Sequence, residues 1–264
     1  MRIIVCLKPV PEPRQWHRLM LDPETRTLLR EGIPATVNPL DKHALEAALR
    51  LREGMGGEII ILSMAPRDTI PVLKEALAMG ADRAVLLSDR AFAGSDTLGT
   101  AYVLSQAVRS LGEYDVILCG NETIDGGTAQ VSAQVAEFLE VPNLMHVSGI
   151  EAAREGPFQV KTRIERGYRA IEIDPPMVLS VVKEVNVPRY VTMMNILEAE
   201  DKEIRVWSSN DLDLTEPIVG LENSPTRMAD LFLPEKRRKA QLLEQDAEGQ
   251  ARVLADRLHR LGFC

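Results

Sequence analysis

The chain has 264 residues, of which 45% are hydrophobic and 27% charged, so it is long enough for one large domain or one domain with an appendage. Its net charge of -8 at pH 7 argues against a nucleic-acid surface, which would need a basic stripe. The three cysteines lie far apart without a CxxC pair, which argues against a disulfide framework and a metal site and favours a reducing compartment.

The apolar segment 3–7 predicts a first strand that is buried on both faces. The sequence has no cleavable signal and no apolar run long enough to cross a membrane, so we expect a cytoplasmic protein without membrane insertion. The proline-rich segment 8–13 ends the strand. We expect residues 14–37 to be irregular, apart from a small hairpin around the turn signal at 22–25.

A helix is predicted to begin at residue 38. Asn38 is a common capping residue, Pro39 suits the first helical position, and Asp41 places an acid in the first turn. Short apolar runs typical of buried strands then alternate with segments of helical spacing. The predicted strands are 3–7, 58–63, 83–88 and 115–119, and the predicted helices begin near residues 38, 68, 95 and 132. This alternation predicts a Rossmann-like, doubly wound, mainly parallel α/β sheet with helices on both faces.

The pattern changes after residue 143, where short strands joined by glycine-containing turns predict a small antiparallel region. The predicted strands there are 146–150, 158–163 and 168–173, and a further strand is predicted at 177–182. Residues 183–196 have no clear period and are expected to form an ordered loop or arm. The charged region 235–262 carries one narrow apolar stripe, which predicts a C-terminal helix that docks on its own domain or on another subunit.

The segment 119–131, CGNETIDGGTAQV, joins the fourth predicted strand to the next helix. The first amides of a helix lack internal partners and the helix dipole is positive there, so such a junction suits an anionic group. Gly126 and Gly127 remove side-chain bulk, Thr128 can cap the helix or donate a hydroxyl, and the loop contains no Lys or Arg. It matches neither a Walker A loop nor GxGxxG. By itself it is equally consistent with a turn that binds nothing.

Four points of the predicted fold converge on this loop. Ligands of parallel sheets bind beyond the carboxyl ends of the strands. Three of these points follow strands, namely Cys6-Leu7-Lys8, Ser63-Met64 and the loop itself, and Asn38 lies at a helix start. If the strands are neighbours, we expect the four points to face one crevice. No spacing supports a Ser-His-Asp, Cys-His or paired-carboxylate arrangement, and we predict neither a catalytic side chain nor a metal ligand.

Five segments in order along the chain carry a resemblance to a known family. They read RIIVCLKPVPEP, NPLDKHALEAALRLRE, LKEALAMGADRAVLLSD and GNETIDGGTAQVSAQVAEFLEVP, and then RxxxG at 163–167 followed by PPMVLSVVKEVNVPRYVTMMNILEA. Together they resemble the β subunit of electron transfer flavoprotein, also called the FixA-type subunit. The resemblance runs from residue 1 to about residue 200, and the C-terminal region is only loosely similar.

This resemblance implies a heterodimer. Family β subunits pair with a larger α subunit that carries an electron-transferring FAD, and they bury an adenine nucleotide of their own. That nucleotide is AMP in the mitochondrial-type branch and a further FAD in the electron-bifurcating branch. The TAQV at 128–131 looks like the bifurcating branch, so we favour FAD over AMP. The implied electron partners are an acyl-CoA or other dehydrogenase, or a quinone oxidoreductase.

The nucleotide residues of the family carry over to the same strand ends and helix start. The implied cofactor-binding residues are Cys6, Asn38, Pro39, Leu40, Asp41, Met64, Gly120, Asn121, Glu122, Thr123, Ile124, Asp125, Gly126, Gly127, Thr128, Ala129, Gln130 and Val131. Asn38, Asp41 and Thr128 would anchor the nucleotide, and the amides from Gly126 to Ala129 would hold its phosphate. One of the two loop acids is expected to bond the ribose or the loop, and the other to be solvated.

The partner-recognition loop of the family maps onto residues 185–200, with its apolar anchor at Met193. A flexible thioether can adapt to several partners. The alternative is that Met193 and Met194 pack on the chain's own core, and we expect at least one of them to do so. Arg189, Tyr190 and Asn195 are the further implied partner-binding residues.

We therefore expect an adenine-nucleotide-binding domain at 1–200, which includes the recognition loop, and a C-terminal extension at 201–264. The expected function is that of an electron-carrier subunit that passes electrons between NADH or dehydrogenases and a partner acceptor, with flavin-based bifurcation as the finer expectation. The alternatives are a non-bifurcating subunit with structural AMP, a non-redox AMP- or ATP-binding module, and a structural subunit with an empty crevice.

Overall fold

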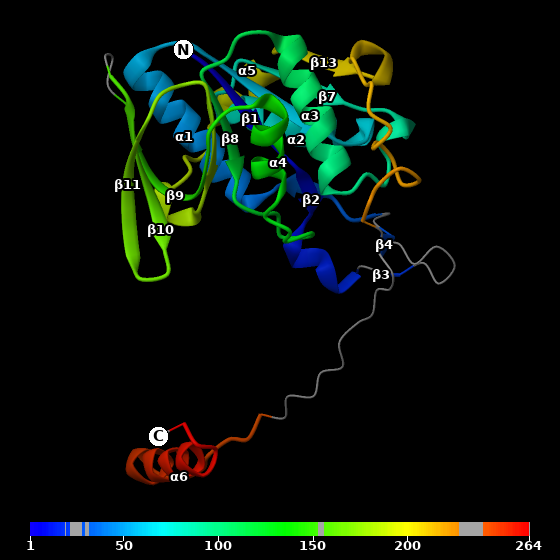
Figure 1. The fold of residues 1–264 in the computed structure, drawn as a ribbon. Coiled ribbons are helices and arrows are strands. Elements are labelled where there is room, and N and C mark those ends of the chain that lie inside the picture. Colours follow the sequence, from blue (N-terminus) through cyan, green and yellow to red (C-terminus); the bar gives the residue numbers. More distant parts are fainter. Residues whose placement is uncertain (19, 22–27, 30–31, 153–155, 227–239, 264) are drawn as a thin grey trace. The chain divides into compact units, whose positions relative to one another are not determined.

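The computed structural model describes the chain except for residues 19, 22–27, 30–31, 153–155, 227–239 and 264. It divides into two compact units, Met1–Ala229 and Asp230–Cys264, which are described one at a time. The larger unit is built on a twisted sheet with helices packed against it (Figure 1).

Within the described part of the chain, nine strands form this sheet in the order β11-β10-β9-β12-β8-β1-β6-β7-β13. They are β1 (Arg2–Cys6), β6 (Glu58–Met64), β7 (Arg83–Leu87), β8 (Val116–Gly120), β9 (Asn143–Glu151), β10 (Phe158–Ile164), β11 (Gly167–Ile173), β12 (Met177–Val181) and β13 (Ile204–Trp207). The pairs from β9 to β13 are parallel, and β10 pairs antiparallel with β9 and β11. The predicted α/β fold with a small antiparallel region is confirmed.

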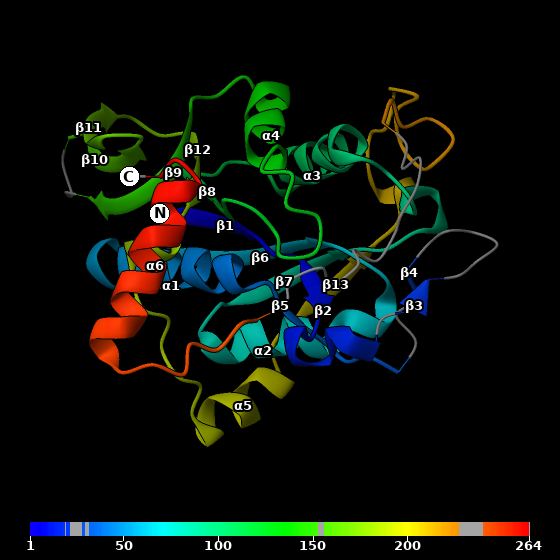
Figure 2. The ribbon, with the colours of Figure 1, turned by 90° about the horizontal axis from the view of Figure 1, so that it is seen from below.

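Helices cover both faces of the central strands, because alternate side chains of a strand point to opposite faces. The helices of the larger unit are α1 (Pro39–Met55), α2 (Ile70–Met79), α3 (Thr97–Leu111), α4 (Val131–Leu139) and α5 (Met193–Glu200). Ile3 and Val5 pack in the apolar cluster that contains α1 and α2, whereas Ile4 and Cys6 pack in the cluster of α3 and α4. Figure 2 shows these two layers on either side of β1 and β6.

Two small sheets lie between β1 and α1 in the sequence. β2 (Pro9–Pro11) pairs antiparallel with β5 (Ala35–Val37), and β3 (Met20–Leu21) pairs antiparallel with β4 (Leu28–Leu29). The predicted hairpin is confirmed by β3 and β4, and its turn lies outside the described residues. The expectation of irregular chain over 14–37 was wrong at the 3-10 helix η1 (Pro13–Arg18) and at β5. Prolines fit β2 because a strand of a two-stranded sheet has one unpaired edge, where no N–H is needed.

The segment that we expected to be a loop or arm is partly helical. It starts with the 3-10 helix η4 (Lys183–Val185), continues without regular structure over 186–192 as expected, and ends in the first four residues of α5. Thr192 caps α5 by accepting a hydrogen bond from the backbone N–H of Asn195 at 3.2 Å. Helix α5 packs against α2 and buries Ala199, so tertiary contact and a threonine cap outweigh the weak periodicity.

The strand β13 lies beyond residue 200 and pairs in parallel with β7, so it completes the main sheet. The division by compactness therefore falls after Ala229. The second unit contains α6 (Ala247–Arg260), which begins at its cap Asp246. Residues 240–246 are not helical and 235–239 lie outside the described residues, so the helix is shorter than the expected 235–262. Among the described residues, no helix is long and apolar enough to cross a membrane.

Candidate functional site

Three of the four points that the sequence placed at one crevice are the ends of adjacent strands. β8, β1 and β6 are consecutive in the sheet and parallel, and they end at Gly120, Cys6 and Met64. The fourth point, Asn38, is joined to the loop after β8, because its side-chain amide donates to the carbonyl of Glu122 at 3.0 Å. The structure therefore brings together the predicted strand ends, the helix start and the loop.

Asn38 stands at the first position before α1, yet its side chain does not cap that helix. It donates to Asp41 Oδ1 at 3.0 Å as well as to Glu122, and its oxygen accepts from the N–H of Ile124 at 3.2 Å. The expected capping role was wrong, because the side chain turns toward the loop. Asn38 is completely buried, so these bonds lie out of water.

Asp41 is the buried acid of the site, with 4% of its surface exposed. Its Oδ2 accepts from the backbone N–H of Lys8 at 2.7 Å, and its Oδ1 accepts from the N–H of Gly120 at 3.2 Å in addition to Asn38. Burial raises the pKa of Asp41 from 3.8 to about 7, although these hydrogen bonds and the charge of Lys8 oppose the rise. Asp41 thus titrates near neutral pH.

Gly120 ends β8 where α1 comes closest to the sheet. A Cβ atom at this position would overlap Asp41 Oδ1 and would lie 2.8 Å from the Cβ of Leu40. The first turn of α1 therefore packs directly on the backbone of residue 120. This contact explains a glycine that the sequence analysis assigned only to nucleotide binding.

The loop after Gly120 is held by hydrogen bonds to β12 and by one bond within the loop. Asn121 is buried, donates its N–H to the carbonyl of Val181 at 2.9 Å, and accepts from the hydroxyl of Ser180 at 3.2 Å. Further along, Gly127 donates to the carbonyl of Thr123 at 2.8 Å. Gly127 and Ala129 have positive φ angles of 59° and 52°, which reorient successive amides.

Helix α4 starts at Val131, and its first turn is not capped by a side chain. Thr128 is exposed and precedes the cap position, which is Gln130, so the expected capping by Thr128 was wrong. Within the described part of the chain, the hydroxyl of Ser132 is buried and has no hydrogen-bond partner. The turn therefore offers backbone amides and one unused hydroxyl.

Lys8 was expected at the crevice because it follows a strand, but it was not counted among the cofactor-binding residues. Its Nζ pairs with Asp125 Oδ1 at 2.9 Å, and it lies 3.9 Å from the position that a Cβ of Gly126 would take. The Lys8 side chain is 43% exposed, whereas that of Asp125 is 7% exposed. A loop without a cation of its own thus receives one from the residue that follows β1. Its position directly after a strand end was the signal that could have identified it.

Two buried thiols lie side by side at this edge. Cys6 and Cys119 are register partners in β1 and β8, and both are free. A hydrogen bond with Cys6 and burial raise the pKa of Cys119 well above its ordinary value, and the charges of Cys6 and Asp41 add to the rise. Cys119 is therefore a protonated thiol at neutral pH. No group of three or more potential metal ligands occurs among the described residues.

The segment 185–200 separates into an anchor and an exposed face. Tyr190 is 97% exposed and Met193 is 73% exposed, so these two predicted partner residues are available at the surface. Asn195 contributes its backbone N–H to the cap of α5. Met194 is 64% exposed as well, so neither methionine packs on the core of its own chain and that alternative was wrong.

Arg189 is the anchor of this segment. It pairs with Glu46 at 2.7 Å and with Glu53 at 2.7 Å, and both acids belong to α1. These hydrogen bonds, first that with Glu46, raise the pKa of Arg189. Burial alone would raise the pKa of Glu46, but hydrogen bonds from Arg189 and Arg50 outweigh it and hold that pKa below its usual value. Arg189 therefore fixes the segment to helix α1.

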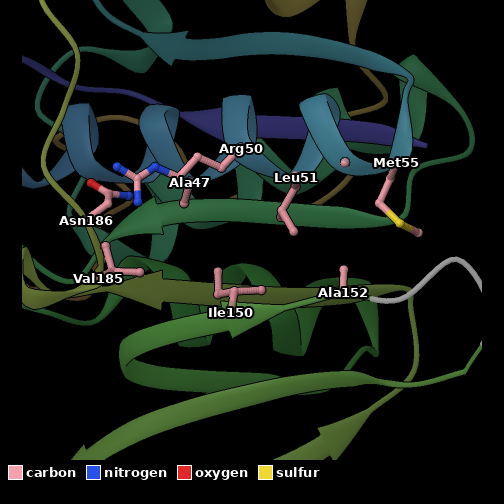
Figure 3. A pocket seen from close by; sticks show the side chains of 9 residues that line it. Ala47, Arg50, Leu51, Met55, Ile150, Ala152, Val185 and Asn186 are labelled. Atoms are coloured by element: carbon pink, nitrogen blue, oxygen red, sulfur yellow. The ribbon is translucent and has the colours of Figure 1, made fainter.

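Two cavities lie away from the predicted nucleotide residues, and the first of them borders the start of the segment 185–200. One, of about 180 Å³, lies between α1 and β9 and is lined mainly by apolar side chains such as Leu51, Met55 and Ile150 (Figure 3). The other, of about 750 Å³, lies at the opposite edge of the sheet, beside Arg2, Tyr114 and Asp115. Neither is lined by a residue of the predicted nucleotide set.

Comparison with known proteins gives consistent matches over nearly the whole chain. A family model described as the electron transfer flavoprotein domain matches residues 25–212. The electron transfer flavoprotein subunit beta of Thermoanaerobacterium thermosaccharolyticum is 40% identical over 260 residues, which cover 98% of each chain. The subunit of the same name from Clostridium acetobutylicum is 38% identical over 258 residues, again 98% of each chain. Subunit CarD of the caffeyl-CoA reductase-Etf complex of Acetobacterium woodii is 41% identical over 89% of this chain and 88% of CarD.

Proposed function

Because the chain belongs to the electron transfer flavoprotein family, among its β subunits, we propose that it pairs with a flavin-carrying α subunit and holds an adenine nucleotide beyond the ends of β8, β1 and β6. Its role is to pass electrons between NADH or a dehydrogenase and a partner acceptor. A bound flavin would supply the redox chemistry, and the residues of this chain would bind, orient and shield it.

The observation that carries this proposal is the phosphate-compatible surface between Lys8 and the start of α4. Lys8 supplies a cation, the uncapped first turn of α4 supplies amides at the positive end of a helix, and Ser132 supplies a buried hydroxyl without a partner among the described residues. The positive φ angles of Gly127 and Ala129 reorient further amides of the loop. A phosphate or pyrophosphate fits this donor set.

We favour FAD over AMP as the nucleotide. The TAQV at 128–131 is the sequence feature behind this choice, and the similarity to a subunit of a caffeyl-CoA reductase-Etf complex adds support. On this reading the electron partner is an oxidoreductase of CoA esters, and the two flavins of the heterodimer provide for bifurcation. The alternative is a non-bifurcating subunit that holds AMP.

The test is the identity of the bound nucleotide. The full chain is purified together with its α subunit, the protein is precipitated with acid, and the released nucleotides are separated by chromatography and counted per heterodimer. We expect two FAD. One FAD and one AMP would support the nucleotide site but reject bifurcation. One FAD without a second nucleotide would favour the alternative of a structural subunit with an empty crevice. A colourless preparation that releases AMP or ATP alone would favour the non-redox module.

The exposed face of 185–200 is the part of the chain that we assign to the electron partner. Tyr190 and Met193 are exposed while Arg189 fixes the segment, which is the arrangement that a docking loop needs. Met193→Asp should leave the flavin spectrum unchanged and slow electron transfer to the acceptor dehydrogenase. Leu221→Asp, at an exposed apolar side chain outside the segment 185–200, is the control and should leave that rate unaltered. Equal rates for both variants would reject this assignment.

A further inference from the structure

We propose that Asn38 and Asp41 act as positioning residues, which hold the nucleotide loop through a buried clamp and do not contact the nucleotide. The clamp consists of the Asn38 amide, the Asp41 carboxylate and the backbone groups that they bond. This inference rests on the proposed nucleotide site. It also reverses the expectation from sequence resemblance that both side chains anchor the nucleotide.

The side chain of Asn38 has both of its N–H donors in use. A carboxamide offers two donors and one acceptor oxygen. One N–H bonds Asp41 Oδ1 at 3.0 Å, the other bonds the carbonyl of Glu122 at 3.0 Å, and the oxygen accepts from the N–H of Ile124 at 3.2 Å. Because Asn38 is completely buried, a ligand could take a donor only by leaving one of these groups without a partner.

Asp41 joins three separate segments of the chain. Its carboxylate accepts from Asn38 at the start of α1, from the N–H of Lys8 after β1, and from the N–H of Gly120 at the end of β8. Only 4% of Asp41 is exposed, and the backbone of Gly120 packs against Oδ1 so closely that a Cβ there would overlap it. The carboxylate is thus enclosed by protein on the side of the sheet.

The clamp fixes the chain after β1 and the loop after β8 relative to each other. After β1 it holds the backbone of Lys8, whose Nζ reaches Asp125 at 2.9 Å. In the loop after β8 it holds Glu122 and Ile124 through Asn38. The donors that would meet a phosphate belong to Lys8 and to the residues that follow Ile124. Asn38 and Asp41 therefore influence the nucleotide through the residues that they hold.

The experiment compares four ligands on one variant. Asn38→Ser keeps a side chain that can cap α1 but cannot span from Asp41 to Glu122 and Ile124. The full chain is purified with its α subunit and freed of the nucleotide in its own site. Binding is then measured for AMP and for three analogues. Adenosine lacks the phosphate, 2′-deoxy-AMP lacks a ribose hydroxyl, and inosine monophosphate carries a different base. Asn223→Ser, an exposed asparagine that bonds only the carbonyl of Val219, is the control.

If Asn38 acts only through the clamp, its loss should lower the affinity for every ligand by the same factor. We expect Asn38→Ser to lower the affinity for all four by about tenfold or more, since the hydrogen bonds that it removes hold the entire loop. The ratios between the ligands should stay those of the wild type, and hydrogen exchange at the backbone amide of Ile124 should become faster. Asn223→Ser should change neither property.

Other outcomes would overturn the clamp. If Asn38→Ser loses discrimination against one analogue, Asn38 contacts directly the group in which that analogue differs. If the affinities stay unchanged, Asn38 has no role in nucleotide binding. Wild-type protein that binds none of the ligands would instead reject the proposed function, and the clamp with it. If Asn38→Ser does not fold, the NMR signal of the Asn38 side-chain amide in the wild type tests whether Asn38 contacts the nucleotide. It should keep its chemical shift when AMP binds, and a large shift would indicate direct contact.

Discussion

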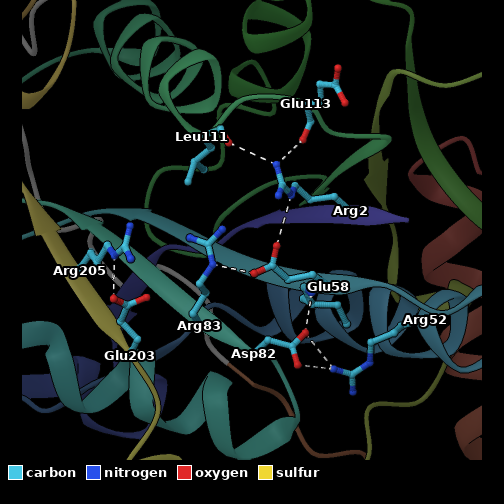
Figure 4. A network of polar contacts seen from close by, with 10 residues as sticks. Arg2, Arg52, Glu58, Asp82, Arg83, Leu111, Glu113, Glu203 and Arg205 are labelled. Atoms are coloured by element: carbon cyan, nitrogen blue, oxygen red, sulfur yellow. Dashed lines mark hydrogen bonds and ion pairs between the residues drawn. The ribbon is translucent and has the colours of Figure 1, made fainter.

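The two edges of the parallel sheet use polar side chains in opposite ways. At the edge where β1 and β8 end, Asn38 and Asp41 are buried and bond mainly to the backbone. At the edge where the strands begin, Glu58 lies between Arg2 at 3.3 Å and Arg83 at 2.7 Å, and all three side chains are partly exposed (Figure 4). The first edge is held mainly by buried side chains that bond the backbone, beside the single Lys8–Asp125 pair, whereas the second carries partly exposed ion pairs.

This difference in burial determines how much a single group contributes. A buried polar group that loses its partner costs about 1–3 kcal/mol, because water cannot replace the partner. An exposed ion pair contributes only about 0.2–1 kcal/mol, because solvent and salt screen it. We therefore expect substitutions at the loop edge to have large effects and substitutions at the opposite edge to have small ones.

The largest expected effect is the pH dependence of stability that Asp41 introduces. Its pKa is about 7 in the folded chain and 3.8 as an isolated group, so between these pH values the folded state binds one more proton than the unfolded state. The free energy of unfolding should therefore fall as pH rises, by about 1.4 kcal/mol per unit and by about 4 kcal/mol in total. Above about pH 7 this contribution is constant.

Asp41→Asn isolates this contribution, because the variant cannot ionise at residue 41. Urea unfolding of both proteins from pH 5 to pH 8 gives two curves of unfolding free energy. Their difference should change steadily up to about pH 7 and then level off. Parallel curves would mean that the folded chain does not raise the pKa of Asp41.

The next effect concerns the packing of α1 on the sheet. Gly120→Ala places a Cβ against Asp41 and Leu40, and overpacking of this kind costs about 1–3 kcal/mol. Gly54→Ala, in the same helix layer, is the control, because no atom lies within 4 Å of a Cβ there. We expect the control to be neutral or stabilising, since alanine favours a helix by about 1 kcal/mol over glycine. Similar unfolding midpoints in urea for both variants would contradict the close contact.

The smallest effect is expected at the opposite edge. Glu58→Gln removes two partly exposed ion pairs and should cost about 1 kcal/mol or less. The loss should shrink further at high salt, because screening weakens the pairs that the wild type retains. Unfolding in urea at low and high ionic strength measures both quantities. A loss as large as that of Gly120→Ala would remove the distinction between the two edges.

The sequence predicted the strand ends of the site well, because apolar runs and helix starts are local signals. It placed Cys6, Asn38, Met64 and the loop at one edge, and the parallel order of β8, β1 and β6 brings them there. It did not predict the bonds of Asn38, because a side chain that caps a helix and one that reaches a distant loop look the same in sequence. It predicted α5 as a loop, because the packing of α5 against α2 is not a local property.

Lys8 and Asp125 illustrate the same limit. Their pairing joins residues that are 117 positions apart, so no local pattern predicts it. The sequence analysis therefore described the loop as lacking a cation, whereas the fold brings one to it. The chemistry of the site became clear only when the order of the strands was known.

The most direct test of the central claim is whether Lys8 and the adjoining loop meet a phosphate. Binding of AMP and of adenosine is measured on the full chain paired with its α subunit, for the wild type, Lys8→Gln and the control Lys74→Gln. Lys74 lies on α2 and pairs with Glu200 of α5. We predict that Lys8→Gln lowers the affinity for AMP by about tenfold or more, since a charge-assisted hydrogen bond contributes about 1.5–3 kcal/mol. The affinity for adenosine should stay unchanged. Equal losses for AMP and adenosine, or no loss for AMP, would contradict a phosphate site at this edge of the sheet.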